Sequence, residues 1–355
     1  HRAPYLNPPF LRGVRRGHHS NGDDRRQQKG VKNARHTANP PQEDDQRRRD
    51  DDHLSLVANI SKLQIGELKA RGVGTLAQLA ALPLPLSWKP DRGSVDSYAR
   101  IREQARLQFE ARESGERKIE ILPIEQGFGL CCLPAPSPGD IFLDFEADPF
   151  VGEHGIEFLF GYVLEVEGRS VYKGHWAFTR DDEKKAFENF VDLVMSRWES
   201  FPGLHIYHYA PYEPAALKRL MGRYATREEE IDRMLRAGLF VDLFAVVRRA
   251  LRASVESYSI KQIEPFYGFE RPTALADARA ALTALQAGLE LGDIAGISED
   301  VKEVVRAYNE DDCRSAMVLR DWLEELRANA IGGGADVPRP EPGGGSPNEK
   351  NTHRP

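Results

Sequence analysis

Two acidic residues stand two positions apart in an otherwise apolar segment of the chain. The run at 141–146 reads IFLDFE, and its carboxylates are Asp144 and Glu146. A short run of this composition predicts a β-strand, and residues two apart on a strand point to the same face. Like charges held side by side among apolar residues are unfavourable unless a cation neutralises them, so the pair predicts a divalent-metal site. The alternative is an edge strand whose polar face is simply hydrated.

A second acidic group lies late in the chain, in the segment YNEDD at 308–312. In the long helix expected there, Tyr308 and Asp312 are four apart and share one face, whereas Asp311 lies about 100° round the helix. Like charges crowded into one turn destabilise a helix unless something gathers them. An exposed acidic face would explain the same residues, so the helix by itself leaves both interpretations open.

A third carboxylate, Glu213, follows the strand expected over 205–209 and opens the next helix. It would project from the carboxyl end of that strand, near the first acidic pair if the sheet closes as expected. His208 is either a neighbour of the metal site or a residue that hydrogen bonds within the turn. Asp242, at the end of the strand expected over 240–243, is a reserve carboxylate.

The elements needed to position these residues define a fold class. Three strands come first and form a meander, with Glu167 and Gly168 as the turn between the second and third. The predicted strands cover 141–146, 155–166, 170–178, 205–209 and 240–243, and the helices include an apolar stripe at 187–198, one opened by Pro214, one capped by Thr226 and Glu229, and one over 298–329. This order predicts an α/β fold of the ribonuclease-H-like kind, a mixed sheet flanked by helices.

No glycine-rich nucleotide motif accompanies these elements. The sequence has neither a GxGxxG after its first strand nor a GxxxxGK(S/T) loop, which argues against a nucleotide cofactor. Doubly wound parallel sheets also begin with alternating strands and helices rather than with a meander.

A small all-α unit is expected before the sheet, over 53–90. Two short helices flank the turn RGVGT, which resembles a helix-hairpin-helix. In such a turn the amides of Gly72, Gly74 and Thr75 can hold a DNA phosphate without reading sequence, although similar hairpins also serve as plain packing units. A helix over 94–112 follows, and its arginines would either extend the DNA contact or form a solvated face; they are Arg100, Arg102, Arg106 and Arg112.

The composition separates a compact part from two polar ends. The 355 residues are 40% hydrophobic with a mean hydropathy of −0.54, values low for a wholly globular chain. Residues 1–50 hold 12 Lys and Arg against 6 Asp and Glu, a balance of +6, so the other 305 residues carry −12 to give the total of −6. We therefore expect residues 1–52 to be a disordered basic arm, which either contacts nucleic acid or is a solvated tail. Eleven of the last 25 residues are Gly or Pro, which predicts a disordered tail over 330–355.

Between these ends we expect the all-α unit, an Arg-rich helix with its connector over 91–138, and the ribonuclease-H-like domain over 139–329. The cysteines offer no disulfide framework or CxxC spacing, so we interpret them as buried small residues in a reducing, cytoplasmic setting; they are Cys131, Cys132 and Cys313. No apolar run approaches the roughly 20 residues of a membrane span, so no membrane partner is expected. Because the chain begins with His1, we expect it to be a piece of a longer polypeptide.

Taken together, these motifs resemble a known family. An Asp-x-Glu on a first strand, an acidic residue after an H-x-x-x-Y segment and a late Tyr-x-x-x-Asp resemble the DEDD exonucleases, which have a ribonuclease-H-like fold. The closer resemblance, over about residues 52–327, is to the predicted ribonuclease-H-like domain (YprB type) of RecB-family putative nucleases. It rests on the phrases DFEADPF at 144–150, YHYAPYEPAALKRLM at 207–221, SVESYSIKQIEPFYGF at 254–269 and YNEDDCRSAMVLRDWL at 308–323.

This resemblance implies a two-metal nuclease. Two Mg²⁺ or Mn²⁺ ions about 3.5–4 Å apart can stabilise both oxygens of an in-line phosphodiester displacement. By resemblance their ligands would be Asp144, Glu146, Glu213 and Asp312, and Tyr308 would orient the attacking water. Related exonucleases usually have Asp where Glu213 stands, so one ligand here has a longer arm. Relatives also carry an upstream RecB-like nuclease domain and a downstream helicase, which makes a helicase the expected partner besides DNA.

Three functions follow as expectations. The leading one is a metal-dependent nuclease, specifically a 3′-5′ exonuclease acting on DNA. The second is a catalytically weak or inactive ribonuclease-H-like module that binds nucleic acid and supports a helicase. The third is a purely structural interaction domain, which predicts no salt-dependent affinity for nucleic acid. Binding of Mn²⁺ separates the first two, because an inert scaffold should not hold two ions at these carboxylates.

Overall fold

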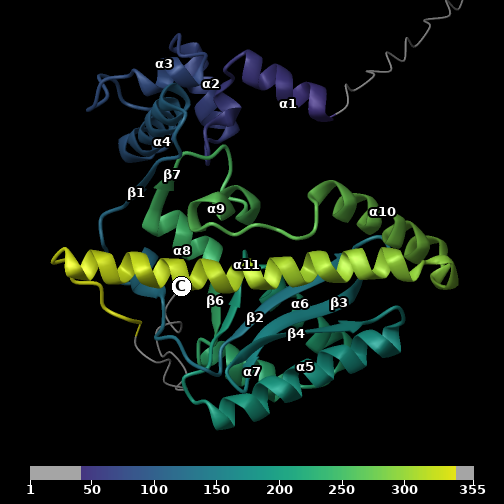
Figure 1. Ribbon diagram of the computed structural model, residues 1–355. Coiled ribbons are helices and arrows are strands. Elements are labelled where there is room, and N and C mark those ends of the chain that lie inside the picture. The colour runs from purple at the N-terminus through teal and green to yellow at the C-terminus, as the bar shows by residue number, and fades with distance from the viewer. Residues whose placement is uncertain (1–40, 341–355) are drawn as a thin grey trace, which may run out of the picture. The chain divides into compact units, whose positions relative to one another are not determined.

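A computed structural model describes residues 41–340 of the chain, and its centre is a mixed sheet (Figure 1). The strands are β2 (Ile141–Asp148), β3 (Ile156–Val166), β4 (Arg169–Trp176), β5 (Ile206–His208) and β6 (Phe240–Asp242). Their order across the five-stranded sheet is β4-β3-β2-β5-β6. β3 pairs antiparallel with β2 and β4, whereas β5 and β6 run parallel to β2. The predicted α/β fold, with its opening meander and mixed sheet, is confirmed.

The hairpin between β3 and β4 turns at the two residues predicted for it. Glu167 and Gly168 both have positive φ, at 50° and 74°. A two-residue turn with positive φ at both positions matches the right-handed twist of the strands on either side. The turn therefore sets the register in which β4 lies along β3.

One face of the sheet is covered by α5 (Arg180–Ser200), α6 (Tyr212–Tyr224) and α7 (Glu228–Arg236). The apolar stripe predicted at 187–198 lies within α5, and its Phe187, Phe190 and Val194 are buried against the strands. From β2, Ile141, Leu143 and Phe145 point into this layer. The alternate residues of β2 must then point to the opposite face.

The opposite face is covered by α8 (Leu243–Ala250), α9 (Ile260–Tyr267) and the long α11 (Glu299–Gly332). Figure 1 shows α11 running across the sheet, and it contacts β2, β3, β4 and β5. α10 (Leu275–Leu291) packs against α11. Phe142 of β2 points into this layer, so Asp144 and Glu146 face α11 as well.

Arg320 of α11 forms an ion pair with Asp140, the residue before β2. Its Nη1 donates to Oδ2 of Asp140 at 2.6 Å. Its guanidinium carbon lies 4.9 Å from the ring centre of Phe142 and 5.1 Å from that of Tyr207. A buried arginine that is both paired and stacked in this way holds the helix at one position along the strand.

A helical region precedes the sheet. It comprises α1 (Pro41–Asp50), α2 (Lys62–Ala70), α3 (Leu76–Ala80) and α4 (Val95–Ser114). Leu68, Leu79 and Tyr98 belong to the separate small core of α2, α3 and α4. The short strands β1 (Ile119–Ile121) and β7 (Leu251–Ala253) pair with each other, and Gln104 of α4 donates to the backbone oxygen of Ala253 at 2.8 Å.

The two ends of the chain differ from the sequence prediction. Residues 41–50 form α1 rather than part of a disordered arm, and residues 1–40 lie outside the described residues. At the other end α11 continues to Gly332, and Arg339 donates to Glu324 at 2.7 Å. The predicted tail is therefore ordered as far as residue 340, because a bidentate ion pair anchors it, and residues 341–355 lie outside the described part.

Two predicted helix starts are also wrong in detail. α6 begins at Tyr212, which places Pro214 inside its first turn rather than at its first position. The capping box of Thr226 and Glu229 is not formed, since the N-cap of α7 is Arg227 and the Thr226 hydroxyl donates to Glu188 at 2.9 Å. Thr226 thus hydrogen bonds to Glu188 of α5 instead of capping α7. None of the helices between residues 41 and 340 is long and apolar enough to cross a bilayer.

Candidate metal centre

Three carboxylates meet on the α11 side of the sheet. Asp144 and Glu146 come from β2, and Asp312 comes from α11. One oxygen of each carboxylate lies within 4.8 Å of the corresponding oxygens of the other two. The meeting arises because Asp144 and Glu146 share one face of β2 and α11 crosses that face. The strand pair and the late helical aspartate that were predicted to converge are thus brought together.

Burial and mutual repulsion act on this acidic group. The pKa of Asp144 is raised to about 8, first because burial disfavours its charge and second because Asp312 is nearby. Burial and the charges of Asp144 and Asp312 likewise raise the pKa of Glu146 well above its ordinary value. The adjacent carboxylates therefore favour protonated forms unless positive charge is supplied. A divalent cation bound to these oxygens would supply that charge.

Asp312 is already neutralised by two basic residues. Nζ of Lys261 on α9 donates to its two oxygens at 2.8 and 3.0 Å, and Arg271 donates to it at 2.6 Å. Arg271 also donates to the buried Glu264 at 2.9 Å. Sequence reasoning missed both basic residues, because nothing in their spacing ties them to the acidic motifs. A metal ion at Asp312 must share that carboxylate with these cations or displace one of them.

Tyr308 lies one turn before Asp312, and the same two cations cover its ring. Nζ of Lys261 is 5.0 Å from the ring centre, and the guanidinium carbon of Arg271 is 5.7 Å from it. Burial and the Asp312 charge raise the pKa of Tyr308 to about 12, so its hydroxyl is protonated near neutral pH. A protonated hydroxyl close to the carboxylates is suited to holding a water molecule.

Asn309 is a buried residue of the site that sequence reasoning missed. Its Nδ2 donates to Oδ2 of Asp144 at 2.7 Å and to the backbone oxygen of the same residue at 3.1 Å. Its Oδ1 accepts a hydrogen bond from the hydroxyl of Tyr172, on β4, at 2.8 Å. Asn309 is 0% exposed, so these protein groups are its partners in place of water. Tyr172 fixes the amide, and the amide in turn fixes Asp144.

Room for Asn309 is provided by Gly161, which lies opposite Asp144 in the β2–β3 ladder. A Cβ at Gly161 would stand 1.5 Å from Oδ1 of Asn309, so a larger residue would force the amide to move. Gly174 of β4 is the ladder partner of Gly161, and a Cβ there would lie 2.7 Å from the Tyr172 hydroxyl. Two glycines opposite each other inside paired strands are the sequence signal of this close approach.

Glu213, in the first turn of α6, is buried but is not one of the three clustered carboxylates. Its Oε2 is buried and has no hydrogen-bond partner within residues 45–340. Nδ1 of His208 is 3.6 Å from that oxygen and donates instead to the backbone oxygen of Ala210 at 2.6 Å. Burial and the charge of Asp144 raise the pKa of Glu213 well above its ordinary value. An unpartnered carboxylate oxygen together with three clustered ones fits a hard divalent cation such as Mg²⁺ or Mn²⁺.

Other residues singled out from the sequence have structural roles. Asp242 is the N-cap of α8, and its Oδ1 accepts from the backbone of Ala245 at 3.2 Å. Cys131 and Cys313 are buried, whereas Cys132 is only partly buried. The prediction of three buried cysteines therefore holds for two of them.

Several polar groups of the glycine turn between α2 and α3 already form hydrogen bonds within the protein. Gly72 has a φ of +81°, a backbone conformation that favours glycine. Gly74 donates to Oε1 of Gln78 at 2.7 Å, and Oγ1 of Thr75 accepts from the backbone of Gln78 at 3.1 Å. Oδ2 of Asp52 accepts from the first turn of α3 at 2.8 Å. A DNA phosphate would compete with Asp52, so phosphate binding at this turn stays a prediction.

The arginines of α4 are mostly engaged within the protein. Arg102 and Arg106 pair with acidic residues of the same helix. Arg112 donates to Asp52 at 2.7 Å. Arg100 is exposed. Three of the four arginines considered for a DNA contact or a solvated face therefore already form ion pairs within the protein.

The fold and the acidic group together define a ribonuclease-H-like domain of the nuclease type. A sequence model of the RNase H superfamily matches residues 141–324, which is more than half of the chain. The chain belongs to the RNase H superfamily. The match begins at the first residue of β2 and ends within α11, so it contains all four carboxylates. No curated protein and no solved structure matches the chain.

Proposed function

We propose that this protein is a metal-dependent nuclease, a 3′-5′ exonuclease that hydrolyses phosphodiester bonds of DNA. The observation that carries the proposal is the meeting of Asp144, Glu146 and Asp312 within 4.8 Å, together with the unpartnered oxygen of Glu213. Membership of the RNase H superfamily supports it. The chemistry supplied by two bound Mg²⁺ or Mn²⁺ ions would be activation of water and stabilisation of an in-line displacement.

The residues of the site have distinct roles in this proposal. The metal ligands are Asp144, Glu146, Glu213 and Asp312. Tyr308 orients the attacking water through its protonated hydroxyl. Asn309 is a positioning residue, because it holds Asp144 without touching the substrate. Lys261 balances the charge of Asp312 until metal binds.

DNA is the proposed substrate because two other parts of the chain suit a polyanion. The turn between α2 and α3, with Gly72, Gly74 and Thr75, resembles a helix-hairpin-helix that holds phosphates through backbone amides. Residues 1–50 carry a balance of +6. A helicase of the RecB-family kind, on a longer polypeptide in the cytoplasm, is the proposed partner.

A specific contact favours a second candidate function, a nucleic-acid-binding module that cleaves weakly or not at all. Lys261 and Arg271 already neutralise Asp312, so a metal ion must compete with them. Glu213 also has a longer side chain than the aspartate usual in related exonucleases. If metal loses this competition, the domain binds nucleic acid in support of a helicase without cutting it.

Cleavage of end-labelled substrates tests both candidates. The purified chain is incubated with single-stranded DNA or RNA labelled at either end, with Mn²⁺, Mg²⁺ or chelator, beside Asp144→Asn and Asp312→Asn. The matched control is Glu325→Gln, which changes an exposed carboxylate on the same helix. Metal-dependent, stepwise shortening of DNA from the 3′ end supports the exonuclease if it is absent from both site variants and persists in the control.

Other outcomes correct or replace the proposal. Shortening from the 5′ end would reverse the polarity, and faster shortening of RNA would change the substrate. Equal background in all four proteins, with nucleic-acid binding retained, would support the binding module. Loss of both cleavage and binding in a folded protein would leave a structural interaction domain.

A further inference from the structure

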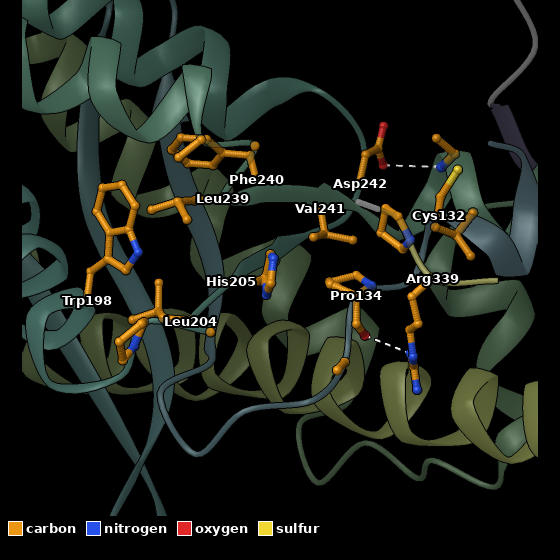
Figure 2. A pocket seen from close by; sticks show the side chains of 18 of the residues that line it. Cys132, Pro134, Trp198, Leu204, His205, Leu239, Phe240, Val241, Asp242 and Arg339 are labelled. Carbon is orange, nitrogen blue, oxygen red and sulfur yellow. Dashed lines mark hydrogen bonds between the residues drawn. The ribbon is translucent and has the colours of Figure 1, made fainter. Parts of the chain in front are cut away.

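A pocket of about 840 Å³ opens at the β6 edge of the sheet, between its two helical layers (Figure 2). Ala245 and Val246 of α8 line it on one side, and Trp198 of α5 lines it on the other. Leu239 and Val241, labelled in Figure 2, also line it. The volume falls in the range of about 300–1,000 Å³ that is typical of ligand sites. We call this pocket the edge slot.

The backbone of β6 presents free hydrogen-bonding groups to the edge slot. Phe240 lies opposite Ile206 in the parallel β5–β6 ladder, and Ile206 donates to the backbone oxygen of Leu239 at 2.7 Å. In a parallel ladder this pattern turns the N–H and C=O of Phe240, and the N–H of Asp242, away from β5. Since β6 is the last strand of the sheet, these groups face the open edge and have no backbone partner among residues 41–340.

The lining of the edge slot is mostly apolar, and its charged residues are Asp242, Arg249 and Arg339. The Asp242 carboxylate accepts from the backbone N–H groups of Ala210 and Ala245 at 3.0 and 3.2 Å. Arg339 is paired with Glu324. Arg249, in contrast, is exposed and forms no ion pair with any residue of the described part of the chain; its guanidinium carbon lies 5.0 Å from the ring centre of Phe128. Nδ1 of His205 is also buried in the lining without a hydrogen-bond partner within that part. A ligand for this slot should therefore be apolar, hydrogen bonding and negatively charged at one end.

We propose that the edge slot binds an extended peptide segment of a partner protein, which joins the sheet as a further strand beside β6. The segment's backbone would pair with the free groups of Phe240 and Asp242, while every second side chain enters the apolar pocket. An acidic side chain of the segment would lie against Arg249. The inference is independent of the proposed nuclease activity, because it uses none of the acidic group.

The chain's own C-terminal residues fit the edge slot less well. Pro340 lines the pocket, and residues 341–355 continue from it. They contain no Val, Ile, Leu, Met or aromatic residue, so they offer nothing to fill an apolar cavity. A partner strand that alternates apolar and acidic residues satisfies the backbone, the pocket and Arg249 together.

Peptide selection on the full chain tests the proposal. Short random peptides displayed on phage are selected on the wild-type protein, and enriched peptides are then measured against variants. Binding should be at least about tenfold weaker to Ala245→Trp, which fills the slot, and to Arg249→Glu. Arg248→Glu is the matched control, since Arg248 is exposed and adjacent but does not line the slot. On peptide binding, amide exchange at Phe240 and Asp242 should slow by at least about tenfold.

Several results would overturn the proposal. Equal affinity for Ala245→Trp, in a variant whose thermal unfolding matches the wild type, would place the peptides elsewhere. Slow amide exchange at Phe240 and Asp242 before any peptide is added would mean that the edge is already covered by the chain's own tail or a second copy. Peptides that bind without slowing those amides would make the slot an apolar pocket and not a strand site. Failure to enrich any sequence would also count against it.

Discussion

Oδ2 of Asp144 accepts a hydrogen bond from Nδ2 of Asn309 at 2.7 Å, so a neutral amide holds one carboxylate of the acidic group. The amide is itself held, because the Tyr172 hydroxyl donates to its Oδ1 at 2.8 Å. With its donor group facing Asp144 and its acceptor facing Tyr172, Asn309 has one favourable orientation. The position of Asp144 therefore depends on β4 as well as on α11.

Replacing Asn309 by alanine should weaken metal binding and lower stability together. The change leaves the Tyr172 hydroxyl and Asp144 without partners, which should reduce the free energy of unfolding by about 1–3 kcal/mol. Titration calorimetry with Mn²⁺ and urea unfolding measure the two effects, with Asn329→Ala at the exposed end of α11 as the control. Unchanged Mn²⁺ affinity in the destabilised variant would reduce Asn309 to a packing role.

Replacing Gly161 by alanine should displace Asn309 and have a similar result. The new Cβ would overlap Oδ1 of Asn309, and we expect a loss of about 1–3 kcal/mol in the free energy of unfolding. Gly222→Ala, within α6, is the matched control, because nothing lies within 4 Å of its Cβ position. That variant should be more stable by about 0.5–1 kcal/mol. Equal stability of the two variants in urea unfolding would contradict the close approach at Gly161.

Replacing Lys261 by methionine should make the metal-free protein less stable but more responsive to Mn²⁺. Asp312 loses one of its two cations, which should cost about 1–3 kcal/mol in the free energy of unfolding. Thermal unfolding in chelator should occur at a lower temperature, and the rise in Tm with Mn²⁺ should exceed that of the wild type, because Nζ no longer competes. Lys302→Met, which removes a pair with the exposed Glu299, is the control. An equal rise would mean that metal binds without displacing Lys261.

In chelator, stability should fall as the pH rises from about 4 to about 8. Folded Asp144 keeps its proton up to a pKa of about 8, whereas its ordinary value is 3.8. The folded state therefore binds more protons than the unfolded state throughout this window, and each rise in pH favours unfolding. Urea unfolding in EDTA at several pH values measures the slope, which Asp144→Asn should reduce and Mn²⁺ should oppose. An undiminished slope in Asp144→Asn would assign the titration to other groups.

How much of the site the sequence reveals depends on how local each signal is. The spacing of two on β2 predicted that Asp144 and Glu146 share a face, and the spacing of four on α11 did the same for Tyr308 and Asp312, because each spacing acts within a single element. That the two elements bring their acidic residues together was predicted only from the family resemblance. Lys261 lies 51 residues before Asp312, and no local pattern links them. The role of Asn309 could not be predicted for a different reason. The sequence feature that indicates it is the pair Gly161 and Gly174, and these residues are seen to lie opposite each other only once the register of β2, β3 and β4 is known.

The fold was more predictable than its details. Apolar patterns and the Glu167–Gly168 turn predicted the meander of the first three strands, because a meander needs only neighbouring pairings. The places of β5 and β6 beside β2 were not predicted individually. The predicted start of α7 was wrong because the expected cap residue hydrogen bonds to a residue of another helix. Thr226 could cap α7 from its position in the sequence, yet its hydroxyl donates to Glu188 on α5. Local propensity does not decide between two such partners.

α11 forms hydrogen bonds at two points along this part of the chain, Arg320 with Asp140, the residue before β2, and Asn309 with Asp144 within β2. Ten residues of uninterrupted helix lie between Asn309 and Arg320. Deleting one of them would shift Arg320 by about 1.5 Å along the helix axis and rotate it by about 100° about that axis, relative to Asn309. Both contacts could not then form against the same strand, whereas the loops that join the other elements can change length without this effect. The spacing of ten residues along α11 therefore helps to determine the geometry of the acidic group, as the identity of its carboxylates does.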